Sequence, residues 1–362
     1  YRVPFMNLLG EKYDLTLVLT ESNEIQAEKE SREKSWFYRG ERTYRAEVLP
    51  CRKILGKYVC FAVLSYLKHH SFDLVFFDMY GTPSVSLALL WLIVRRKPYC
   101  LSIDGGLISP NGFLVKKLKK TFLRHAELLL SPGTAGDDFL LYYGAEPEKI
   151  RRYPFTSVKR DYLLSSPLSE EEKREKKKAL GMPEEKAVLT VGRFIPLKRF
   201  DTLLKAAKSL PDSVGIYFIG GEPTEEYVEL AREAGAGRVH FLGFMNQNDL
   251  KEYYMAADVF TMTTESDVWG LVVNEAMACG LPVVSTDKCV AGVCLIRDGV
   301  NGYLVPVGDE TVLADRLKKC LFGVGSRQMA EESLKTIAGH TVENMAARTI
   351  EVLAECETRL GL

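Results

Sequence analysis

Residues 257–285, ADVFTMTTESDVWGLVVNEAMACGLPVVS, place a strand, a loop, a helix and a second strand in close succession. The apolar, β-branched run Val259 to Thr263 predicts a buried strand, and a short polar loop follows it. Good helix formers predict a helix at 271–279, which Gly280 would end in the position usual for a C-terminal glycine. Residues 282–286 predict another buried strand. This order is typical of one unit of a parallel α/β sheet.

Two acidic residues lie at the start of this helix. Asp267 comes just before it, and Glu275 lies a little over one turn inside it. The unpaired N–H groups and positive dipole end of a helix N-terminus favour an anion. A carboxylate as deep as Glu275 is better suited to accept hydrogen bonds from sugar hydroxyls beside a phosphate. A solvated cap and a surface glutamate on an ordinary helix would explain the same two residues without any ligand.

A second motif follows the strand predicted at 187–191. The residues after it are Gly192, Arg193 and, five positions after the arginine, Lys198. The glycine permits close approach of the backbone. Arginine suits forked recognition of phosphate oxygens, and lysine adds a point charge. The motif therefore predicts a phosphate site at the carboxyl end of this strand, although two surface cations beside a strand are the alternative.

Together these motifs resemble the signature of retaining glycosyltransferases of family 4, which have the GT-B fold. That signature has an acidic residue, a Gly-Phe-Gly-like turn, a Glu eight positions after the first acid, and then Ala-Met-Ala-x-Gly-x-Pro-Val. Asp267, the turn 269–271, Glu275 and residues 276–284 match in this order. The resemblance implies an α/β fold of two Rossmann-like, doubly wound domains facing a cleft, with a C-terminal helix that crosses back to the first domain.

The same resemblance implies roles for individual residues. It places Glu275 on the ribose of a nucleotide sugar and Asp267 on the donor sugar, where the family usually has the longer Glu. Arg193 and Lys198 would hold the leaving diphosphate. The remaining contacts that it implies, to the diphosphate and the base, fall on Gly192, Phe244, Met245, Gly270, Leu271 and Val272.

Two aspartates of the first half follow predicted strands. Asp78 comes after the strand at 74–77, and Asp104 ends the strand at 98–103. Ligands collect beyond the carboxyl ends of the strands in an open parallel sheet. Many members of the resembled family carry a His near the second position, and Asp104 takes its place here, so we expect Asp104 in the catalytic site. The sequence Asp-Gly-Gly is also simply a turn.

The helix predicted at 111–129 is basic and amphipathic. Its apolar positions are Val115, Leu118, Phe122 and Leu129, and its basic positions are Lys116, Lys117, Lys119, Lys120 and Arg124. Such a helix can lie on an anionic membrane surface. It could equally pack on the core with its lysines in water. Peripheral membrane contact would suit a lipid-linked acceptor.

Hydrophobic patterns and turn residues predict the rest of the elements. Further helices are predicted at 4–12, 55–68, 84–94, 135–143, 200–209, 249–257 and 342–359. Further strands are predicted at 15–19, 128–131, 150–154, 215–219 and 239–242. The charged segment 21–47 receives no element. Ser169 is a candidate helix N-cap, with Glu172 placed to complete a capping box.

These elements divide into domains. We expect an acceptor-binding Rossmann-like domain at 1–155, whose first strand is absent because the sequence opens on a helix. A charged linker region at 156–186 would lead to a nucleotide-sugar-binding Rossmann-like domain at 187–340. A C-terminal helix at 341–362 would pack on the first domain.

Composition bounds the setting. The 362 residues carry 48 basic and 48 acidic side chains, so no global field favours nucleic acid. Eight cysteines are scattered without zinc spacing and suit a reducing cytosol. No apolar run is long enough to span a bilayer. We therefore expect a cytoplasmic protein, associated in one reading with the inner face of the membrane, and no metal.

The resulting hypothesis is a metal-independent, retaining hexosyltransferase. It would move a sugar from a nucleotide diphosphate sugar, with a UDP-sugar as the favoured donor and no other cofactor, to a glycan or polyprenyl-linked acceptor in bacterial surface polysaccharide assembly. No carboxylate is a convincing nucleophile, which favours front-face attack assisted by the leaving phosphate. The alternatives are a nucleotide-sugar epimerase of the GT-B fold and a non-catalytic nucleotide-sugar-binding subunit.

Overall fold

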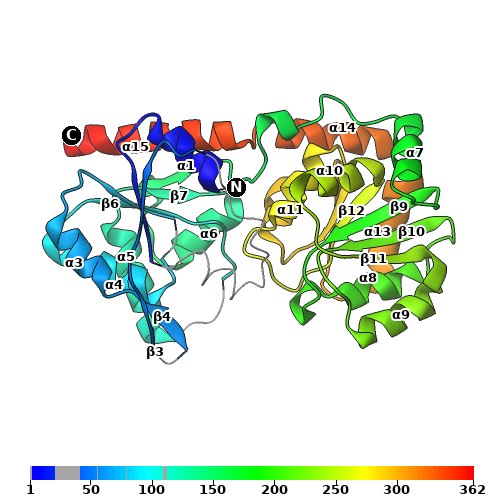
Figure 1. Cartoon of the computed structure of the whole chain (residues 1–362), viewed down its shortest axis with the longest axis horizontal. Coiled ribbons are helices and arrows are strands. Elements are labelled where there is room, and N and C mark those ends of the chain that lie inside the picture. The colour runs from blue at the N-terminus through cyan, green and yellow to red at the C-terminus, as the bar shows by residue number, and fades with distance from the viewer. Residues whose placement is uncertain (1, 21–40, 55, 79, 109–111) are drawn as a thin grey trace. The chain divides into compact units, whose positions relative to one another are not determined.

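The computed structural model describes residues 2–20, 41–54, 56–78, 80–108 and 112–362. The chain divides into two compact units. The first unit is formed by Tyr1–Phe155 together with Val342–Leu362, and the second by Thr156–Thr341. The segment that we expected as a linker, 156–186, thus falls within the second unit. Each unit has its own parallel sheet (Figure 1).

The second unit is built on a six-stranded sheet with the order β11-β10-β9-β12-β13-β14, and every neighbouring pair is parallel. Its strands are β9 (Lys186–Val191), β10 (Val214–Ile219), β11 (Val239–Leu242), β12 (Val259–Met262), β13 (Val283–Thr286) and β14 (Gly302–Val305). Numbered within the unit, the order is 3-2-1-4-5-6, the doubly wound arrangement of dinucleotide-binding domains. The strand order reverses between β9 and β12, which makes this the expected ligand position.

Helices cover both faces of this sheet (Figure 1). They are α7 (Glu170–Ala179), α8 (Phe200–Ala207), α9 (Glu225–Gly235), α10 (Gln247–Ala256), α11 (Leu271–Ala278), α12 (Val290–Leu295), α13 (Glu310–Phe322) and α14 (Ser326–Ile337). Helices α8, α9 and α13 share the main core cluster with the strands. On the other face α10 packs against α7 and α11, and α11 packs against α14. Strands β10, β12 and β13 are buried at every residue, and β9 at every residue but Lys186, as expected of parallel strands covered on both faces. The outer strands β11 and β14 are partly buried.

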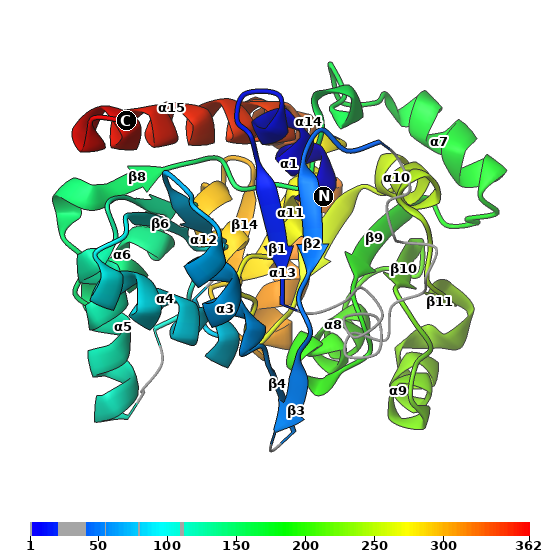
Figure 2. The same ribbon diagram turned by 60° about the vertical axis from the view of Figure 1, so that its left-hand side comes forward.

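The first unit contains a four-stranded parallel sheet, β5-β6-β7-β8, and a separate parallel pair, β1-β2 (Figure 2). Its strands are β1 (Thr16–Leu19), β2 (Arg45–Val48), β3 (Arg52–Ile54), β4 (Lys57–Val59), β5 (Val75–Phe77), β6 (Tyr99–Ser102), β7 (Leu129–Ser131) and β8 (Ile150–Arg152). Its helices are α1 (Arg2–Gly10), α3 (Ala62–His69), α4 (Pro83–Arg95), α5 (Phe113–His125), α6 (Thr134–Tyr142) and α15 (Val342–Leu360).

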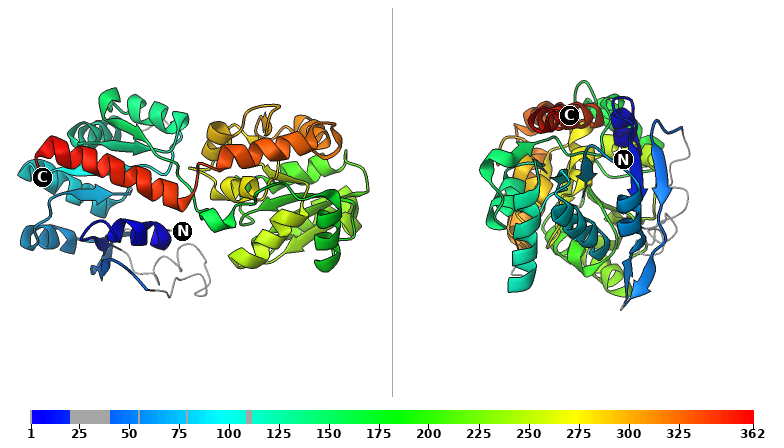
Figure 3. Two further views of the ribbon diagram at one scale, coloured as in Figure 1. Left: turned by 90° about the horizontal axis from the view of Figure 1, so that it is seen from above. Right: turned by 90° about the vertical axis from the view of Figure 1, so that its left-hand side faces the viewer.

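The last helix, α15, belongs to the first unit and lies alongside α1 (Figure 3). Arg151 beside β8 donates two hydrogen bonds to the Glu355 carboxylate, at 2.8 and 2.6 Å. The buried thiols of Cys100 and Cys356 lie 3.6 Å apart. The chain therefore returns to its first unit after completing the second. None of the helices in the described residues is long and apolar enough to cross a membrane.

Two predictions for the first unit were wrong. The helix expected at 55–68 begins only at Ala62, because the preceding residues form the antiparallel hairpin β3–β4 around Gly56, whose φ of +76° suits glycine. The charged segment 21–47 contains the start of β2, which pairs with β1. Residues 21–40 of that segment lie outside the described residues, as does residue 111 at the start of the predicted basic helix.

Candidate functional site

The site is built at the carboxyl ends of β9 and β12, where the strand order of the second unit reverses. Hydrogen bonds join the loops that follow these two strands. The Thr263 hydroxyl donates to the Lys198 carbonyl at 2.8 Å, and the Thr264 hydroxyl donates to the Leu197 carbonyl at 3.0 Å. The Glu265 amide donates to the same Leu197 carbonyl at 2.8 Å. The two loops are therefore fixed as one surface.

Lys198 and Asp267 form an ion pair across these loops. The Lys198 ammonium lies 2.6 Å from Oδ2 of Asp267, and both side chains are about four-fifths buried, with 16% and 22% exposed. The other oxygen, Oδ1, accepts a hydrogen bond from the Trp269 amide at 3.2 Å. The Asp267 amide donates to the Lys288 carbonyl at 3.0 Å. Each carboxylate oxygen thus has one partner, and the backbone of Asp267 is fixed as well.

Arg193 differs from Lys198 in its surroundings. Its side chain is exposed, and it makes no side-chain hydrogen bond or ion pair with any residue that the structure describes. Gly192, just before it, donates its amide to the Ile219 carbonyl at 2.8 Å. A Cβ at Gly220 would lie 2.6 Å from the Gly192 carbonyl oxygen, so the backbones of β9 and β10 approach closely at their ends. The exposed Arg193 guanidinium is therefore attached to a closely packed part of the backbone, at the carboxyl end of β9.

The N-terminus of α11 adjoins the ion pair. Its N-cap is Gly270, with φ of +100°, and a Cβ there would lie 2.6 Å from the Cys289 sulfur. The Cys289 thiol donates to the Trp269 carbonyl at 3.2 Å, and the Trp269 indole donates to Oδ1 of Asn274 at 2.8 Å. No side chain caps the amides at the start of the helix, at Leu271 and Val272. These amides are available to an anion.

Glu275 lies one turn inside α11 with both carboxylate oxygens engaged. The Ser157 hydroxyl donates to Oε1 at 2.9 Å, and the Tyr254 hydroxyl donates to Oε2 at 3.3 Å. Burial raises the pKa of Glu275, and the two hydroxyls oppose that shift. The sequence predicted neither partner. Ser157 fell in the expected linker, and Tyr254 read as an ordinary position of the helix at 249–257.

Phe244 and Met245 lie in the turn after β11, on the far side of β10 from the ion pair. Phe244 is 51% exposed, and its ring lies 3.5 Å from where a Cβ at Gly221 would be. An exposed aromatic ring over a glycine offers a flat surface on which a base could stack.

Asp78 and Asp104 follow β5 and β6 of the first unit, as the sequence places them. Arg2 of α1 pairs with both, and its guanidinium lies 2.8 Å from Oδ2 of Asp104. Burial raises the pKa of Asp104, and the Arg2 charge opposes that shift. The sequence did not signal Arg2. The predicted catalytic residues thus fall into two groups, Asp104 in the first unit and Arg193, Lys198 and Asp267 in the second.

The described residues contain no group of three or more His, Cys, Asp or Glu side chains that could hold a metal ion. The carboxyl ends of the strands carry an exposed arginine, a paired lysine, the N-terminus of α11 and two acids. Among the described residues, no side chain pairs with the arginine or caps the helix. This combination suits recognition of a diphosphate with hydroxyl groups on both sides.

Comparison with solved structures defines the fold class. The chain is similar to the crystal structure of Anabaena Alr3699/HepE in complex with UDP, with a TM-score of 0.76 at 20% identity, covering 97% of this chain and 95% of that one. It is also similar to WaaG, a glycosyltransferase involved in lipopolysaccharide biosynthesis, with a TM-score of 0.68 at 18% identity, covering 96% of this chain and 94% of that one. The fold is therefore α/β and of the GT-B class, as predicted.

Sequence comparison narrows the class for the second unit. Residues 171–335 match the family described as Glycosyl transferases group 1. The D-inositol 3-phosphate glycosyltransferase of Mycobacterium tuberculosis (strain ATCC 25618 / H37Rv) is 36% identical over 185 residues. That match covers 48% of this chain and 38% of the relative, so the chain spans little more than a third of that relative's length. The match to the family lies wholly within the second unit.

Proposed function

We propose that this chain is a retaining glycosyltransferase of the family 4 type, which takes a sugar from a nucleotide diphosphate sugar. The observation that carries the proposal is the convergence of Arg193, Lys198 and the uncapped N-terminus of α11 on the reversal point of the six-stranded sheet. The match of residues 171–335 to the glycosyl transferases group 1 supports it. The chemistry of the site supports it as well, because Arg193, Lys198 and the N-terminus of α11 all place positive charge at the carboxyl ends of β9 and β12.

The diphosphate is the leaving group in this reaction, and it gains negative charge as the glycosidic bond breaks. Arg193, Lys198 and the amides at Leu271 and Val272 would stabilise that charge where it develops. A charge-assisted hydrogen bond of this kind contributes about 1.5–3 kcal/mol. Arg193 needs to break no ion pair with a described residue to reach a phosphate, whereas Lys198 must leave Asp267.

Donor binding would exchange the partners of Lys198 and Asp267, which pair with each other in the structure. When Lys198 turns to the diphosphate, Oδ2 of Asp267 loses its cation and becomes free to accept a hydrogen bond from a donor-sugar hydroxyl. Glu275 would accept from the ribose hydroxyls in place of Ser157 and Tyr254. Phe244 and Met245 would line the base pocket. One bound donor would thus replace the contacts that Lys198 makes with Asp267 and that Ser157 and Tyr254 make with Glu275.

The structural neighbours guide the choice of donor and acceptor. One of them, Anabaena Alr3699/HepE, has been solved in complex with UDP and also with UDP-glucose, which favours a UDP-sugar. Another, WaaG, is involved in lipopolysaccharide biosynthesis. We therefore propose a glycan or polyprenyl-linked acceptor in bacterial surface polysaccharide assembly. Retention would proceed by front-face attack, with no metal or other cofactor. A glycosyl-enzyme trapped on Asp104 or Asp267 and seen by mass spectrometry would contradict that mechanism.

Helix α5 supports a cytoplasmic enzyme with peripheral membrane contact. Phe122 is buried, but Phe113 and Leu114 at the start of the helix are 79% and 78% exposed. Lys116 lies over the Tyr142 ring at 4.2 Å and Lys119 lies over the Tyr143 ring at 4.0 Å. Exposed apolar residues beside lysines suit insertion into an anionic lipid surface.

The test compares binding and turnover of a UDP-sugar in the full chain and in Arg193→Ala. The variant is expected to bind UDP-glucose roughly 10- to 100-fold more weakly by calorimetry, from the loss of one charge-assisted contact. Arg232→Ala is the matched control, because Arg232 is an exposed arginine of the same unit, paired only with Glu229. Equal affinity in all three proteins would refute the proposal.

The non-catalytic binding subunit is the second candidate. It is favoured by one observation, that Asp104 and Asp267 are both held in ion pairs. Donor hydrolysis in the absence of acceptor separates the two readings. The enzyme would release sugar slowly in a reaction that Arg193→Ala abolishes, whereas a binder would release none. An epimerase would convert the donor into a new sugar nucleotide.

A further inference from the structure

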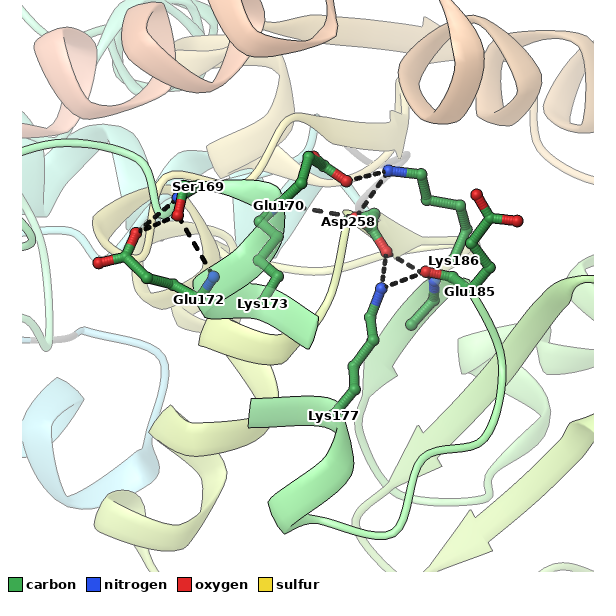
Figure 4. A network of polar contacts seen from close by, with 9 residues as sticks. Ser169, Glu170, Glu172, Lys173, Lys177, Glu185, Lys186 and Asp258 are labelled. Carbon is green, nitrogen blue, oxygen red and sulfur yellow. Dashed lines mark hydrogen bonds and ion pairs between the residues drawn. The ribbon is translucent and has the colours of Figure 1, made fainter. Parts of the chain in front are cut away.

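A second charged cluster lies at the opposite edge of the same sheet, where β9 and β12 begin. Its centre is Asp258, whose side chain is 5% exposed. The Asp258 carboxylate accepts from the Lys177 ammonium at 2.6 Å and from the Ala187 amide at 2.8 Å (Figure 4). Lys186 lies 3.5 Å away and Lys173 3.7 Å away. Three lysines thus surround one carboxylate.

The positive charge of this cluster exceeds what its partners neutralise. Lys177 also donates to the Glu185 carbonyl at 2.6 Å, and Lys186 pairs with Glu170, which is 76% exposed (Figure 4). Lys173 has the long contact to Asp258 and makes no side-chain hydrogen bond with a described residue, although its side chain is only 12% exposed. A buried ammonium without hydrogen bonds is costly unless something else satisfies it.

A cavity of about 410 Å³ opens beside Lys173. Its basic lining residues are Lys173, Lys186 and Arg327, and its acidic ones are Glu170 and Asp258. This volume falls within the range of roughly 300–1,000 Å³ that is usual for small-molecule sites. The two acids are already paired with lysines, so the charge that remains toward the cavity is positive.

The N-terminus of α14 forms another side of this cavity. Ser326, Arg327 and Ala330 of its first turns line the space. The N-cap is Gly325, so no side chain accepts a hydrogen bond from the first amides of this 12-residue helix. The Arg327 guanidinium extends from the same turn, 65% exposed and 3.5 Å from Glu331. The N-terminus of α14 and the Lys173 side chain therefore line the same cavity.

We infer that this cavity is a binding site for a phosphate group, carried either by inorganic phosphate or by a small phosphate monoester. Lys173 would supply the buried cation, and the Ser326 hydroxyl and the Arg327 amide would bind the oxygens, because the Ser326 amide already donates to the Gly323 carbonyl at 3.1 Å. The Arg327 guanidinium would close the site from the surface. The bound anion would link α7 to α14. Because the cavity lies at the amino ends of the strands, it is separate from the proposed donor site at their carboxyl ends, and the inference stands without the proposed function.

The test measures the thermal midpoint of the full chain against inorganic phosphate, with sodium chloride holding the ionic strength constant. Phosphate is expected to raise the midpoint in a saturable manner, because a ligand of the folded state stabilises it. Lys173→Gln and Arg327→Gln should each weaken the apparent phosphate affinity at least tenfold. Arg327 is largely exposed, so its variant tests the site even where Lys173→Gln fails to fold.

Two matched variants separate this site from the others. Arg232→Gln changes an exposed arginine of the same unit and should keep the full shift. Arg193→Gln alters the proposed diphosphate site and should also keep it. A shift that persists in Lys173→Gln and Arg327→Gln would overturn the inference. So would a shift that only Arg193→Gln removes, or the absence of any phosphate effect beyond that of chloride.

A parallel titration identifies the source of the phosphate group. Glycerol 3-phosphate is compared with inorganic phosphate, and glycerol serves as the uncharged control. A monoester site predicts a tighter response to glycerol 3-phosphate, and a free-anion site predicts a response to inorganic phosphate alone. In either case Lys173→Gln must weaken the apparent affinity at least tenfold. A response to glycerol that equals the response to its phosphate would refute the site.

Discussion

Two ion pairs of the second unit have the same length but differ in burial and in position, since they lie at opposite ends of the strands. Lys198 and Asp267 at the carboxyl edge of the sheet, and Lys177 and Asp258 at the amino edge, are each separated by 2.6 Å. The first pair is 16% and 22% exposed, and the second 7% and 5%. The length of an ion pair therefore does not show whether the pair stabilises the fold or can take part in ligand binding.

The backbone partners explain the difference. Asp258 accepts from the Ala187 amide at 2.8 Å, and its own amide donates to the Ala187 carbonyl at 2.9 Å. It is part of the junction between β9 and β12 and cannot change partner without opening the sheet. Lys198 ends the short 3-10 helix Pro196–Lys198, and Asp267 lies in the loop after β12, so both are beyond the ends of the strands. A partly solvated pair on loops can exchange one partner for a ligand at small cost.

The largest expected effect comes from breaking the amino-edge pair. Asp258→Asn leaves Lys177 without its counter-charge in a buried position, a change that costs about 3–5 kcal/mol. The second unit should therefore unfold at a markedly lower temperature, by roughly 6–20 °C for a unit of this size. Differential scanning calorimetry of the full chain measures the shift.

Asp287→Asn is the control for that variant. Asp287 pairs with Lys288 at 3.1 Å, and both side chains are half exposed. An exposed pair of this kind contributes at most about 1 kcal/mol. Equal losses in Asp258→Asn and Asp287→Asn would contradict the view that the amino-edge pair holds the sheet.

The next largest effect tests the role of Glu275 at the carboxyl ends of the strands. Glu275→Gln replaces a charged acceptor of ribose hydroxyls by a neutral one, and we expect UDP to bind roughly 10- to 100-fold more weakly by calorimetry. One of the two hydroxyls, Ser157 or Tyr254, can still donate to the amide oxygen, and the other can accept from the amide nitrogen, so the fold should persist. Unchanged UDP affinity would remove Glu275 from the site.

The same variant has a pH signature. Burial raises the pKa of Glu275 in the folded chain, so ionised Glu275 opposes folding at neutral pH, and this penalty disappears as the pH falls through the raised pKa. Glu275→Gln should therefore be more stable than the parent chain near pH 7, and the gap should close toward pH 4.5. A constant gap across this range would place the cause elsewhere than in the charge.

A smaller effect is expected for Asp267→Asn. Removing the charge releases Lys198 from its 2.6 Å pair, so UDP should bind as tightly as before or slightly more tightly. Turnover of a UDP-sugar should fall about tenfold or more, because a charge-assisted contact to the donor sugar is lost. Affinity and kcat measured together check this. A loss of UDP affinity would instead mean that Asp267 serves to orient Lys198.

The sequence predicted the second unit well because its signals are local. The buried strand at 187–191, the turn at Gly192 and the helix ended by Gly280 each depend on neighbouring residues, and the structure has β9, the close backbone approach and α11 at those places. Parallel strands buried on both faces are continuous apolar runs, which are easy to recognise. The same runs give no strand order, so the junction of β9 with β12 came only from the structure.

Partners distant along the chain could not be predicted. Ser157 bonds Glu275 from 118 positions away, and Arg2 bonds Asp104 from 102 positions away. Nothing in the spacing of residues signals such pairs. The sequence analysis placed Lys173 and Lys177 in a charged linker region, because a buried and an exposed lysine look alike in a sequence until their contacts with Asp258 are known.

The smallest expected effect tests how α7 positions these lysines. Ser169 and Glu172 form the predicted capping box, in which the Ser169 hydroxyl accepts from the Glu172 amide and the Glu172 carboxylate accepts from the Ser169 amide at 2.7 Å. Ser169→Ala should cost about 0.5–2 kcal/mol of stability.

Hydrogen bonds from Ser169 lower the pKa of Glu172, so their contribution to stability is present above pH 4.5 and is lost as the pH falls through that lowered pKa. The destabilisation that calorimetry measures for Ser169→Ala should therefore become smaller at acid pH. At pH 7 the destabilisation by Asp258→Asn should be the larger of the two, because that variant breaks a buried ion pair. A Ser169→Ala loss as large as that of Asp258→Asn would mean that the start of α7, rather than the buried carboxylate, holds the lysines in place.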